Sequence, residues 1–178
     1  MTILLLSKKG KEVMNDKDYI RAVNLYTDSL FKIAYSYCIN RQDAEDVVQN
    51  TFLSFYKVNK TFDSDEHMKN YLVKMTVNNC KHIFLSSWNK KVVLFDEFKG
   101  DNYYTLENQD EHYELYRAII SLPEKYRVVV HLYYFEDYSV KEIAELISVK
   151  ETTVQTRLLR ARTKLKNILQ EVWRHENE

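Results

Sequence analysis

The sequence predicts an all-α protein of two small helical domains joined by a linker, with a helix-turn-helix in the C-terminal domain. Two glycines and one proline in 178 residues leave few positions that break a helix. Apolar residues recur at three- and four-residue steps along most of the chain, which is the spacing of amphipathic helices. With 45% apolar and 29% charged residues, the composition is that of a folded protein rather than a disordered or fibrous one.

Three helices are predicted in the N-terminal region. The first spans residues 16–38, where Ile20 and Leu30 belong to one apolar stripe. The second spans residues 41–57, and the third runs from residue 65 to about residue 88. The second helix has an apolar face and, around its polar side, four acidic or amide residues: Asp43, Asp46, Gln49 and Asn50. From the residues alone, this polar side is an ordinary solvated helix face.

An acidic stretch separates this region from the rest of the chain. Residues 92–111 contain six acidic residues and a single lysine, together with Gly100, which suits a turn or an irregular segment. We therefore predict a linker over residues 93–110, between an N-terminal domain at 15–92 and a C-terminal domain at 111–174.

Four helices are predicted after the linker. One spans residues 113–122, and the next, over residues 123–137, begins at a proline, which the first helical position tolerates. Ser139 and Glu142 then have the spacing of a capping box, which predicts the start of a short helix. A tight turn at Ser148 leads into a longer basic helix, and this order of elements is typical of a helix-turn-helix.

The last helix concentrates positive charge. Its first part, VKETTVQTRLLRARTKLK at residues 149–166, holds six basic residues and one acid, although the whole chain balances 26 basic with 26 acidic residues. Such a local patch favours a polyanion partner at this helix. Helical steps from Val154 through Leu158 to Leu165 form a stripe that must face the core. The opposite, outward face carries Gln155, Thr156, Leu159, Arg160 and Thr163.

These outward residues suit the recognition of double-stranded DNA. Basic side chains neutralise phosphates, while Gln155, Thr156 and Arg160 can reach base edges in the major groove. An exposed Leu159 can touch a thymine methyl group. The competing interpretation is a solvated charged face on a terminal helix, and the capped helix and turn before it count against that interpretation.

The sequence offers no motif for catalysis, for a metal or cofactor, or for membrane insertion. It contains no nucleophile elbow and no phosphate-binding loop, and neither the five histidines nor Cys38 and Cys80 have metal-type spacing. The N-terminal TILLL is too short for a signal peptide, and no run approaches the roughly 20 apolar residues of a membrane span. We therefore expect a cytoplasmic protein that is not an enzyme and uses no cofactor.

Two motifs, in this order, resemble one family closely: DAEDVVQNTF at residues 43–52 and LPEKYRVVVHLYYFEDYSVKEIAELISVKETTVQTRLLRARTKL at residues 122–165. They are similar to the extracytoplasmic-function group of bacterial RNA polymerase sigma factors, over about residues 19–170. The resemblance implies a transcription initiation factor whose N-terminal domain, sigma region 2, binds core RNA polymerase and the −10 promoter element. It implies further that the C-terminal domain, sigma region 4, binds the −35 element, and that an anti-sigma factor sequesters the protein.

The resemblance also implies three groups of site residues. For the −35 element they lie on the recognition helix: Gln155, Thr156, Arg157, Leu159, Arg160, Thr163 and Lys164. For the −10 element, with a pocket for an extruded base, they are Phe62, Lys74, Met75, Asn78, Asn79 and Lys81. For the clamp helices of the largest polymerase subunit they are Asp43, Asp46, Gln49 and Asn50, of which the first three suit the role of acceptors for arginines.

Three features depart from the family pattern. His82 and the following SSWNKK replace an arginine-rich run, so the phosphate contacts of that run do not transfer directly. Ser148 replaces the usual turn glycine, which requires a non-glycine residue in a left-handed conformation at modest cost. Lys150 stands where a serine cap is common.

A self-sufficient helix-turn-helix regulator is the main alternative, because the C-terminal half alone is compatible with a repressor or a response regulator. The N-terminal half distinguishes these proteins from one another. A response regulator would show strands and a phospho-acceptor aspartate in an α/β receiver domain, whereas residues 16–90 have a helical pattern throughout.

Overall fold

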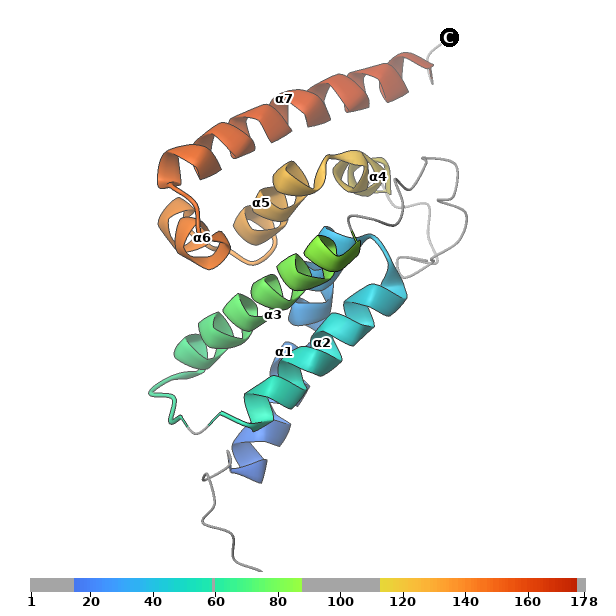
Figure 1. The fold of residues 1–178 in the computed structure, drawn as a ribbon. Helices are drawn as coiled ribbons and strands as arrows, with labels where there is room; N and C mark the ends of the chain where they lie inside the picture. Colours follow the sequence, from blue (N-terminus) through green and yellow to red (C-terminus); the bar gives the residue numbers. More distant parts are fainter. Residues whose placement is uncertain (1–14, 59, 88–112, 176–178) are drawn as a thin grey trace, which may run out of the picture.

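The computed structural model describes residues 15–58, 60–87 and 113–175, and within these ranges the chain is helical and contains no strand (Figure 1). The helices described are α1 (Asp16–Cys38), α2 (Arg41–Tyr56), α3 (Asp65–Ser87), α4 (Tyr113–Ser121), α5 (Glu124–Tyr134), α6 (Val140–Ile147) and α7 (Glu151–His175). The all-α prediction is therefore confirmed. The linker predicted at 93–110 lies outside the described residues, so the domain boundaries stay a prediction.

Helices α1, α2 and α3 pack on one another (Figure 1). Their shared core is apolar, and its fully buried side chains include Leu30, Val47, Phe55 and Leu72. Asparagine caps begin the first two helices. The Asn15 side chain accepts a hydrogen bond from the Lys17 amide (3.1 Å), and Asn40 accepts one from the Asp43 amide (2.9 Å).

Ile20 is 57% exposed, so its assignment to the buried stripe of the first helix is wrong. Tyr19 makes the contact instead, edge-on to the rings of Phe52 and Tyr56, with centroids 6.3 and 5.0 Å away. Consecutive helical residues point about 100° apart, so packing through Tyr19 turns Ile20 towards solvent.

The predicted cap and turn of the helix-turn-helix are confirmed. The Ser139 hydroxyl accepts from the Glu142 amide (3.3 Å), and the Glu142 carboxylate accepts from the Ser139 amide (2.8 Å), which is a capping box. Ser148 takes the left-handed conformation that its position requires, with φ 59° and ψ 53°. Its amide donates to the Ala144 carbonyl, which satisfies an acceptor at the end of α6.

Helix α5 is shorter than predicted at both ends. Pro123 caps the helix from the preceding position, and the helix ends at Tyr134 rather than at residue 137. The chain then turns through Asp137, which has φ 59°, and the Tyr138 amide donates to the Leu132 carbonyl (3.1 Å). Because this backbone bond satisfies a carbonyl in the last turn, the helix stops there.

The two groups of helices share a core. Helix α5 packs on α1 and α6 packs on α3, while α7 lies across α4, α5 and α6 (Figure 1). Among the described residues, a continuous apolar cluster runs from Leu30 and Leu72 in the first group to Val129 and Ile143 in the second. A smaller cluster forms around Ala161, where α7 meets α4 and α5.

Arg127 joins the two groups from within this core. The residue is 3% exposed. Its guanidinium donates to the carbonyls of Ser36 and Tyr37 at the end of α1. It also donates to the carbonyls of Ile120 and Leu122 in its own group. Carbonyls in the last turn of a helix lack intrahelical partners, so Arg127 supplies donors that α1 needs.

Three further polar contacts cross between the groups. Lys81 on α3 donates to the Ile147 carbonyl at the end of α6 (2.8 Å). Glu136, after α5, accepts a hydrogen bond from Ser29 on α1 (2.7 Å) and contacts Lys69 on α3 (2.9 Å). The seam between the groups therefore combines apolar packing with hydrogen bonds to main-chain carbonyls and with contacts to the Glu136 carboxylate.

No helix in the described ranges is long and apolar enough to cross a membrane. The same residues contain no cluster of three His, Cys, Asp or Glu side chains that could hold a metal ion. Cys80 is buried and Cys38 is half-buried, and both are free thiols. A hydrogen bond with Cys38, followed by burial, raises the pKa of the Cys80 thiol, which keeps it protonated and unreactive.

Candidate nucleic-acid interface

The first half of α7 has a buried face and an exposed face. Val154, Leu158 and Ala161 are buried in the core. The opposite face carries Gln155, Thr156, Leu159, Arg160 and Thr163, all of them exposed, and Lys164 is exposed at its edge, seven residues after Arg157. Leu159 is 63% exposed. The predicted division of this helix into two faces is confirmed, whereas its contact with DNA stays a prediction.

The two threonines of this face bond to their own helix. Thr156 Oγ1 donates to the Thr152 carbonyl (2.8 Å), and Thr163 Oγ1 donates to the Leu159 carbonyl (3.1 Å). Their hydroxyl protons therefore point back at the backbone. Each outward surface consists of an acceptor oxygen and a methyl group, which suits base-edge donors and thymine methyls.

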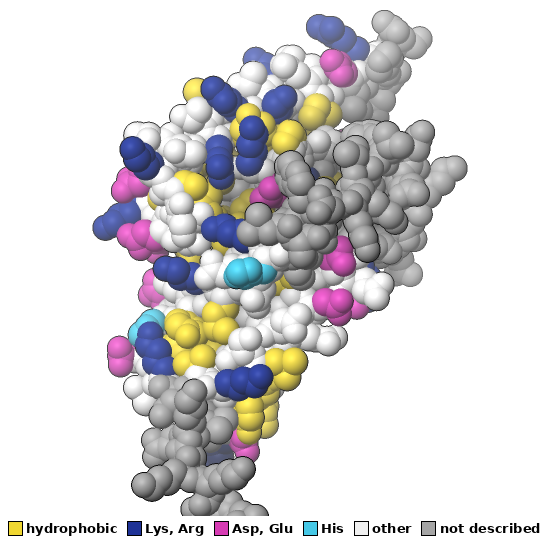
Figure 2. All heavy atoms as spheres, in the orientation of Figure 1, with side chains coloured by type: hydrophobic (Ala, Val, Ile, Leu, Met, Phe, Trp, Pro, Cys, Tyr) yellow, Lys and Arg dark blue, Asp and Glu magenta, His cyan; other side chains and the backbone are white. Residues whose placement is uncertain are grey.

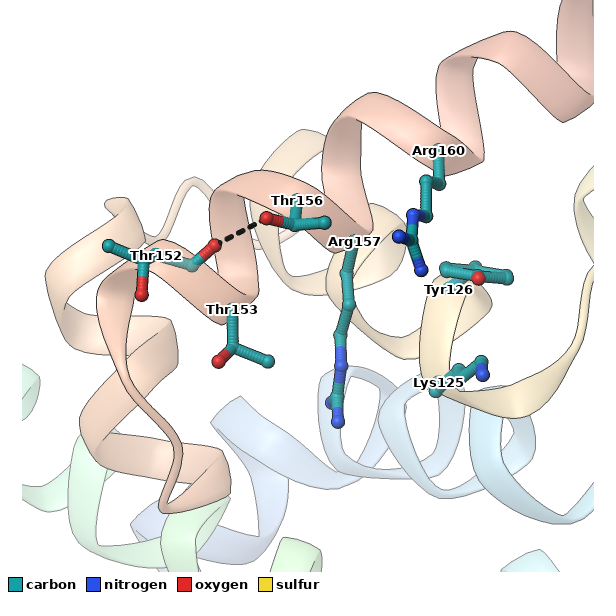
Figure 3. Close-up of a pocket in the computed structure, with 7 residues that line it drawn as sticks. All are labelled: Lys125, Tyr126, Thr152, Thr153, Thr156, Arg157 and Arg160. Atoms are coloured by element: carbon teal, nitrogen blue, oxygen red, sulfur yellow. Dashed lines mark hydrogen bonds between the residues drawn. The ribbon is translucent and has the colours of Figure 1, made fainter.

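Arg157 lies off this outward face. It is half-buried, and Figure 3 shows its side chain running from α7 towards the helices of the N-terminal group. There its charge, with those of Arg127 and Lys81, opposes the burial that raises the pKa of Glu124. Among the seven residues assigned to the −35 element, all of which the structure describes, Arg157 is the one that turns inward.

A hollow opens between the start of α5 and the start of α7 (Figure 3). Its walls are formed by Lys125, Tyr126, Thr152, Thr153, Thr156, Arg157 and Arg160. Hydrogen bonding with Arg160 lowers the pKa of the Tyr126 phenol, and the Lys125 charge acts in the same direction. Sequence reasoning missed Lys125 and Tyr126 because they precede the helix-turn-helix. The available signal was a basic residue directly beside an aromatic one.

Basic side chains gather on this side of the molecule. Figure 2 shows Lys and Arg side chains clustered over its upper part, where α7 crosses the other C-terminal helices. The exposed basic residues of α7 include Arg160, Arg162, Lys164 and Lys166. Arg162 differs from the others, because its Nε donates to the Tyr134 hydroxyl (2.8 Å) at the end of α5. The positive field of this face favours a polyanion.

The structure brings only part of the −10 set together. Lys74 and Asn78, four residues apart, are exposed on one face of α3, and Met75 beside them is half-buried. The Phe62 ring packs on Tyr71, with centroids 5.4 Å apart, and Tyr71 lies on the same face of α3, one turn before Lys74 and Met75. Tyr71 precedes Asn78 by seven residues, which is about 10 Å along the helix.

Asn79 and Lys81 point towards other helices. Asn79 Nδ2 donates to Thr51 Oγ1 on α2 (3.0 Å), and Lys81 donates to the Ile147 carbonyl (2.8 Å). Partial burial lowers the pKa of Lys81, and the charges of Arg157 and Lys74 add to this effect against that of Glu124. Both side chains therefore have structural partners in this conformation.

Sequence reasoning missed the setting of Phe62. Its ring lies 5.3 Å from that of His67 and 5.4 Å from that of Tyr71. The exposed Lys60 lies over two of these rings, 5.6 Å from the Phe62 centroid and 5.0 Å from the Tyr71 centroid. The alternation of basic and aromatic residues before α3 was the available signal. A cation beside aromatic rings suits an unstacked base.

The polar face of α2 is exposed as predicted. Asp43, Asp46, Gln49 and Asn50 are all exposed. Leu53 follows Gln49 by four residues and Asn50 by three, so it lies on the same face of α2. It is 58% exposed, which sequence reasoning missed. Acceptors beside an exposed leucine form a surface suited to another protein.

Family models match both halves of the chain. The model described as Sigma-70 region 2 matches residues 22–89, which contain most of α1 and all of α2 and α3. The model described as Sigma-70, region 4 matches residues 112–165, which contain α4, α5, α6 and the first part of α7. The exposed faces described above lie within these two matches.

Individual proteins agree with these matches. The RNA polymerase sigma factor SigV of Bacillus subtilis is 29% identical over 145 residues, which cover 80% of this chain and 85% of SigV. The ECF RNA polymerase sigma factor SigW of the same organism is 25% identical over 189 residues, covering 95% and 99%. The sigma factor RpoE in complex with the anti-sigma factor NepR, from Bartonella quintana, has a TM-score of 0.65 at 19% identity, over 86% of this chain and 98% of that one. At that identity the structural likeness shows a shared fold.

Proposed function

The chain belongs to the extracytoplasmic-function group of RNA polymerase sigma factors, and from this premise we propose how its surfaces divide the contacts of an initiation factor. It is an alternative sigma factor that acts in transcription initiation, with core RNA polymerase and promoter DNA as partners. The match of the N-terminal helices to region 2 leaves the alternative, a self-sufficient helix-turn-helix regulator, without support.

The proposed domains are 15–92 for region 2 and 111–174 for region 4, with the acidic linker at 93–110 between them. The matched ranges 22–89 and 112–165 fall inside these bounds. Region 2 would contact core polymerase through α2 and the −10 element through α3. Region 4 would contact the −35 element through the exposed face of α7, with Gln155 and Thr156 reaching base edges.

The observation that carries this proposal is the exposed basic face of α7 behind a capped helix-turn-helix. A run-off transcription assay with purified core polymerase and genomic promoter fragments tests the function. Addition of the chain is expected to start transcription at defined sites that core polymerase alone does not use. Transcripts that do not depend on the chain would reject the proposal.

Three further properties complete the proposal. The chain acts in the cytoplasm, because core polymerase and the genome are there. It has no catalytic activity of its own, and the chemistry of RNA synthesis belongs to polymerase. An anti-sigma factor holds it inactive, in keeping with the structures of RpoE with NepR and of CnrH with the cytosolic domain of CnrY, which share its fold.

Asp46→Arg is expected to weaken binding to core polymerase about tenfold or more while leaving the fold intact. The carboxylate is exposed on the polar face of α2, so its value lies in charge-assisted contacts across an interface. Competition for core polymerase at moderate salt measures the loss. Asp18→Arg, at an exposed acid on α1, is the control and should bind normally. If Asp46→Arg competed normally and its circular dichroism spectrum were unchanged, the polar face of α2 would be an ordinary solvated surface that does not bind core polymerase.

Asn78→Ala is expected to slow promoter opening without affecting assembly or upstream binding. An exposed amide can form a hydrogen bond with the edge of an unstacked base, and binding one such base stabilises the open promoter by roughly 1 to 3 kcal/mol. Opening about five pairs costs roughly 7 kcal/mol, so the pocket cannot open DNA without polymerase. Permanganate reactivity of thymines at the start site should fall, and a pre-melted template should restore transcription.

Asn79→Ala provides the contrast on the adjacent position. Its amide bonds to Thr51, so its loss is expected to reduce stability by about 1 kcal/mol rather than to impair base capture. If Asn78→Ala opened a linear promoter at the parental rate, Asn78 would be an ordinary surface residue of α3.

A further inference from the structure

The hollow between α5 and α7 has an unusual lining. Three of its seven described wall residues are basic, namely Lys125, Arg157 and Arg160. The other four carry hydroxyl groups, namely Tyr126, Thr152, Thr153 and Thr156, of which Thr156 already donates its proton to the Thr152 carbonyl. Cations and hydroxyls are the side chains that hold the phosphates of nucleic acids. The wall contributes no carboxylate that would repel an anion.

Tyr126 is the fixed part of this wall. The residue is 7% exposed, and its ring packs with Leu122, Val130 and Ala161 between α5 and α7. The ring is therefore held by the core, while the phenol borders the hollow (Figure 3). A buried aromatic ring with a polar end at the surface is well suited to orient a flexible neighbour.

Arg160 is the exposed part. It is exposed on α7, and Figure 3 shows its side chain directed towards Tyr126 and over the hollow. The proximity of Arg160 lowers the pKa of the Tyr126 phenol, in agreement with the placement of the two side chains in Figure 3. A guanidinium has five donors, so it can keep the phenol as one partner and still offer donors to an anion.

The start of α5 adds to the positive character of the hollow. Lys125 is exposed in the first turn of α5, and Pro123 caps that helix without a side-chain hydrogen bond. Amide groups in the first turn of a helix carry partial positive charge. When the outward face of α7 lies in a major groove, residues beside the helix come against the phosphates that border the groove.

We propose that this hollow seats one phosphate of the promoter backbone at the −35 element, with Lys125 and Arg160 as direct contacts and Tyr126 as the residue that positions Arg160. The inference rests on the proposed function, because it requires α7 to lie in the groove. In this proposal Arg160 contacts a phosphate, whereas the sequence predicts that it contacts a base edge. It also adds α5 to a surface otherwise made of the helix-turn-helix.

Binding of the holoenzyme to promoter fragments, measured across a salt series, tests the phosphate contact. Lys125→Ala is expected to weaken binding on all sequences and to lower the slope of log K against log salt by about one unit. Lys17→Ala is the matched control, since Lys17 is also an exposed lysine in a first helical turn, and it should change neither quantity. Gln155→Ala is the contrasting variant and should change base preference with the salt slope unchanged.

Tyr126→Phe tests the positioning role, because it keeps the ring and removes the hydroxyl. It is expected to weaken binding several-fold on all sequences, by less than Arg160→Ala does. In the double variant, Tyr126→Phe should add little to the effect of Arg160→Ala, because the hydroxyl acts through that arginine. A merely structural tyrosine would give additive effects.

The outcomes separate this inference from the function on which it rests. If Lys125→Ala keeps the parental salt slope while Gln155→Ala loses base preference, the hollow is not a phosphate site and the function stands. If neither variant changes binding, α7 does not recognise DNA and the proposed −35 contact fails with it. If Arg160→Ala changes preference at one base position with an unchanged slope, Arg160 contacts a base. Additive effects in the double variant reject the role of Tyr126.

Discussion

Replacing Arg127 with alanine is expected to lower the free energy of unfolding by at least about 3 kcal/mol. The guanidinium donates to four main-chain carbonyls, those of Ser36, Tyr37, Ile120 and Leu122. Removal would leave buried acceptors unsatisfied, at about 1 to 3 kcal/mol each, and would also open a cavity. Burial lowers the pKa of Arg127 to about 10, so the side chain stays charged at neutral pH and keeps all its donors.

Urea denaturation of the full chain measures this loss of unfolding free energy, and two further variants serve as comparisons. Arg127→Lys keeps the charge but cannot reach four carbonyls from one ammonium, so its loss should be intermediate. Arg162→Ala removes an exposed arginine that bonds to a tyrosine hydroxyl, and its loss should stay below about 1 kcal/mol. A loss below 1 kcal/mol in Arg127→Ala would show that the seam between the helix groups does not depend on this residue.

Stability is expected to fall by up to about 3 kcal/mol between pH 6.5 and pH 4 because of His131. Burial lowers the pKa of this side chain from 6.5 to about 4, against the opposing charge of Glu136 and with a contribution from Lys32. The side chain is 12% exposed, and the Glu136 carboxylate is 3.9 Å from its Nε2. The folded chain therefore holds a neutral imidazole.

The direction follows from which state binds the proton first. As the pH falls below 6.5, the unfolded chain protonates its imidazole while the folded chain does not, so unfolding becomes easier. The stability that depends on a neutral His131 is fully present above about pH 6.5 and is lost as the pH approaches 4. Denaturation midpoints of the parent and of His131→Gln across this range isolate the effect from that of the carboxylates. The variant should show a flatter profile than the parent. Parallel profiles for parent and His131→Gln would contradict the prediction.

The local structure of the C-terminal helices was predictable from short stretches of sequence. The capping box of Ser139 and Glu142, the left-handed Ser148 and the two faces of α7 all occur as expected. Each depends on residues a few positions apart, because helix caps and helical periodicity are properties of the local backbone. The exposed face of α2 was predictable for the same reason.

The candidate site was predictable only in part. The sequence placed Gln155 and Leu159 on the outward face, but it could not show that Arg157 turns inward or that Tyr126 lies beside Arg160. The hollow takes residues from α5 and from α7, and their proximity depends on how those two helices pack. Periodicity gives the direction of a side chain relative to its own helix, but not the neighbour that it meets.

The tertiary structure alone decided the roles of the residues at the seam. Arg127, in a helix that the sequence marks only as amphipathic, bonds to a carbonyl 91 residues earlier, and Lys81 bonds to one 66 residues later. Main-chain carbonyls at helix ends have no signature in the sequence, so a donor that meets them cannot be recognised before the helices are placed. The sequence determined which helices form and which faces are apolar, because those depend on neighbours within two turns. The burial of a charge such as Arg127 depends on which helix ends meet, and that is settled when α5 packs on α1.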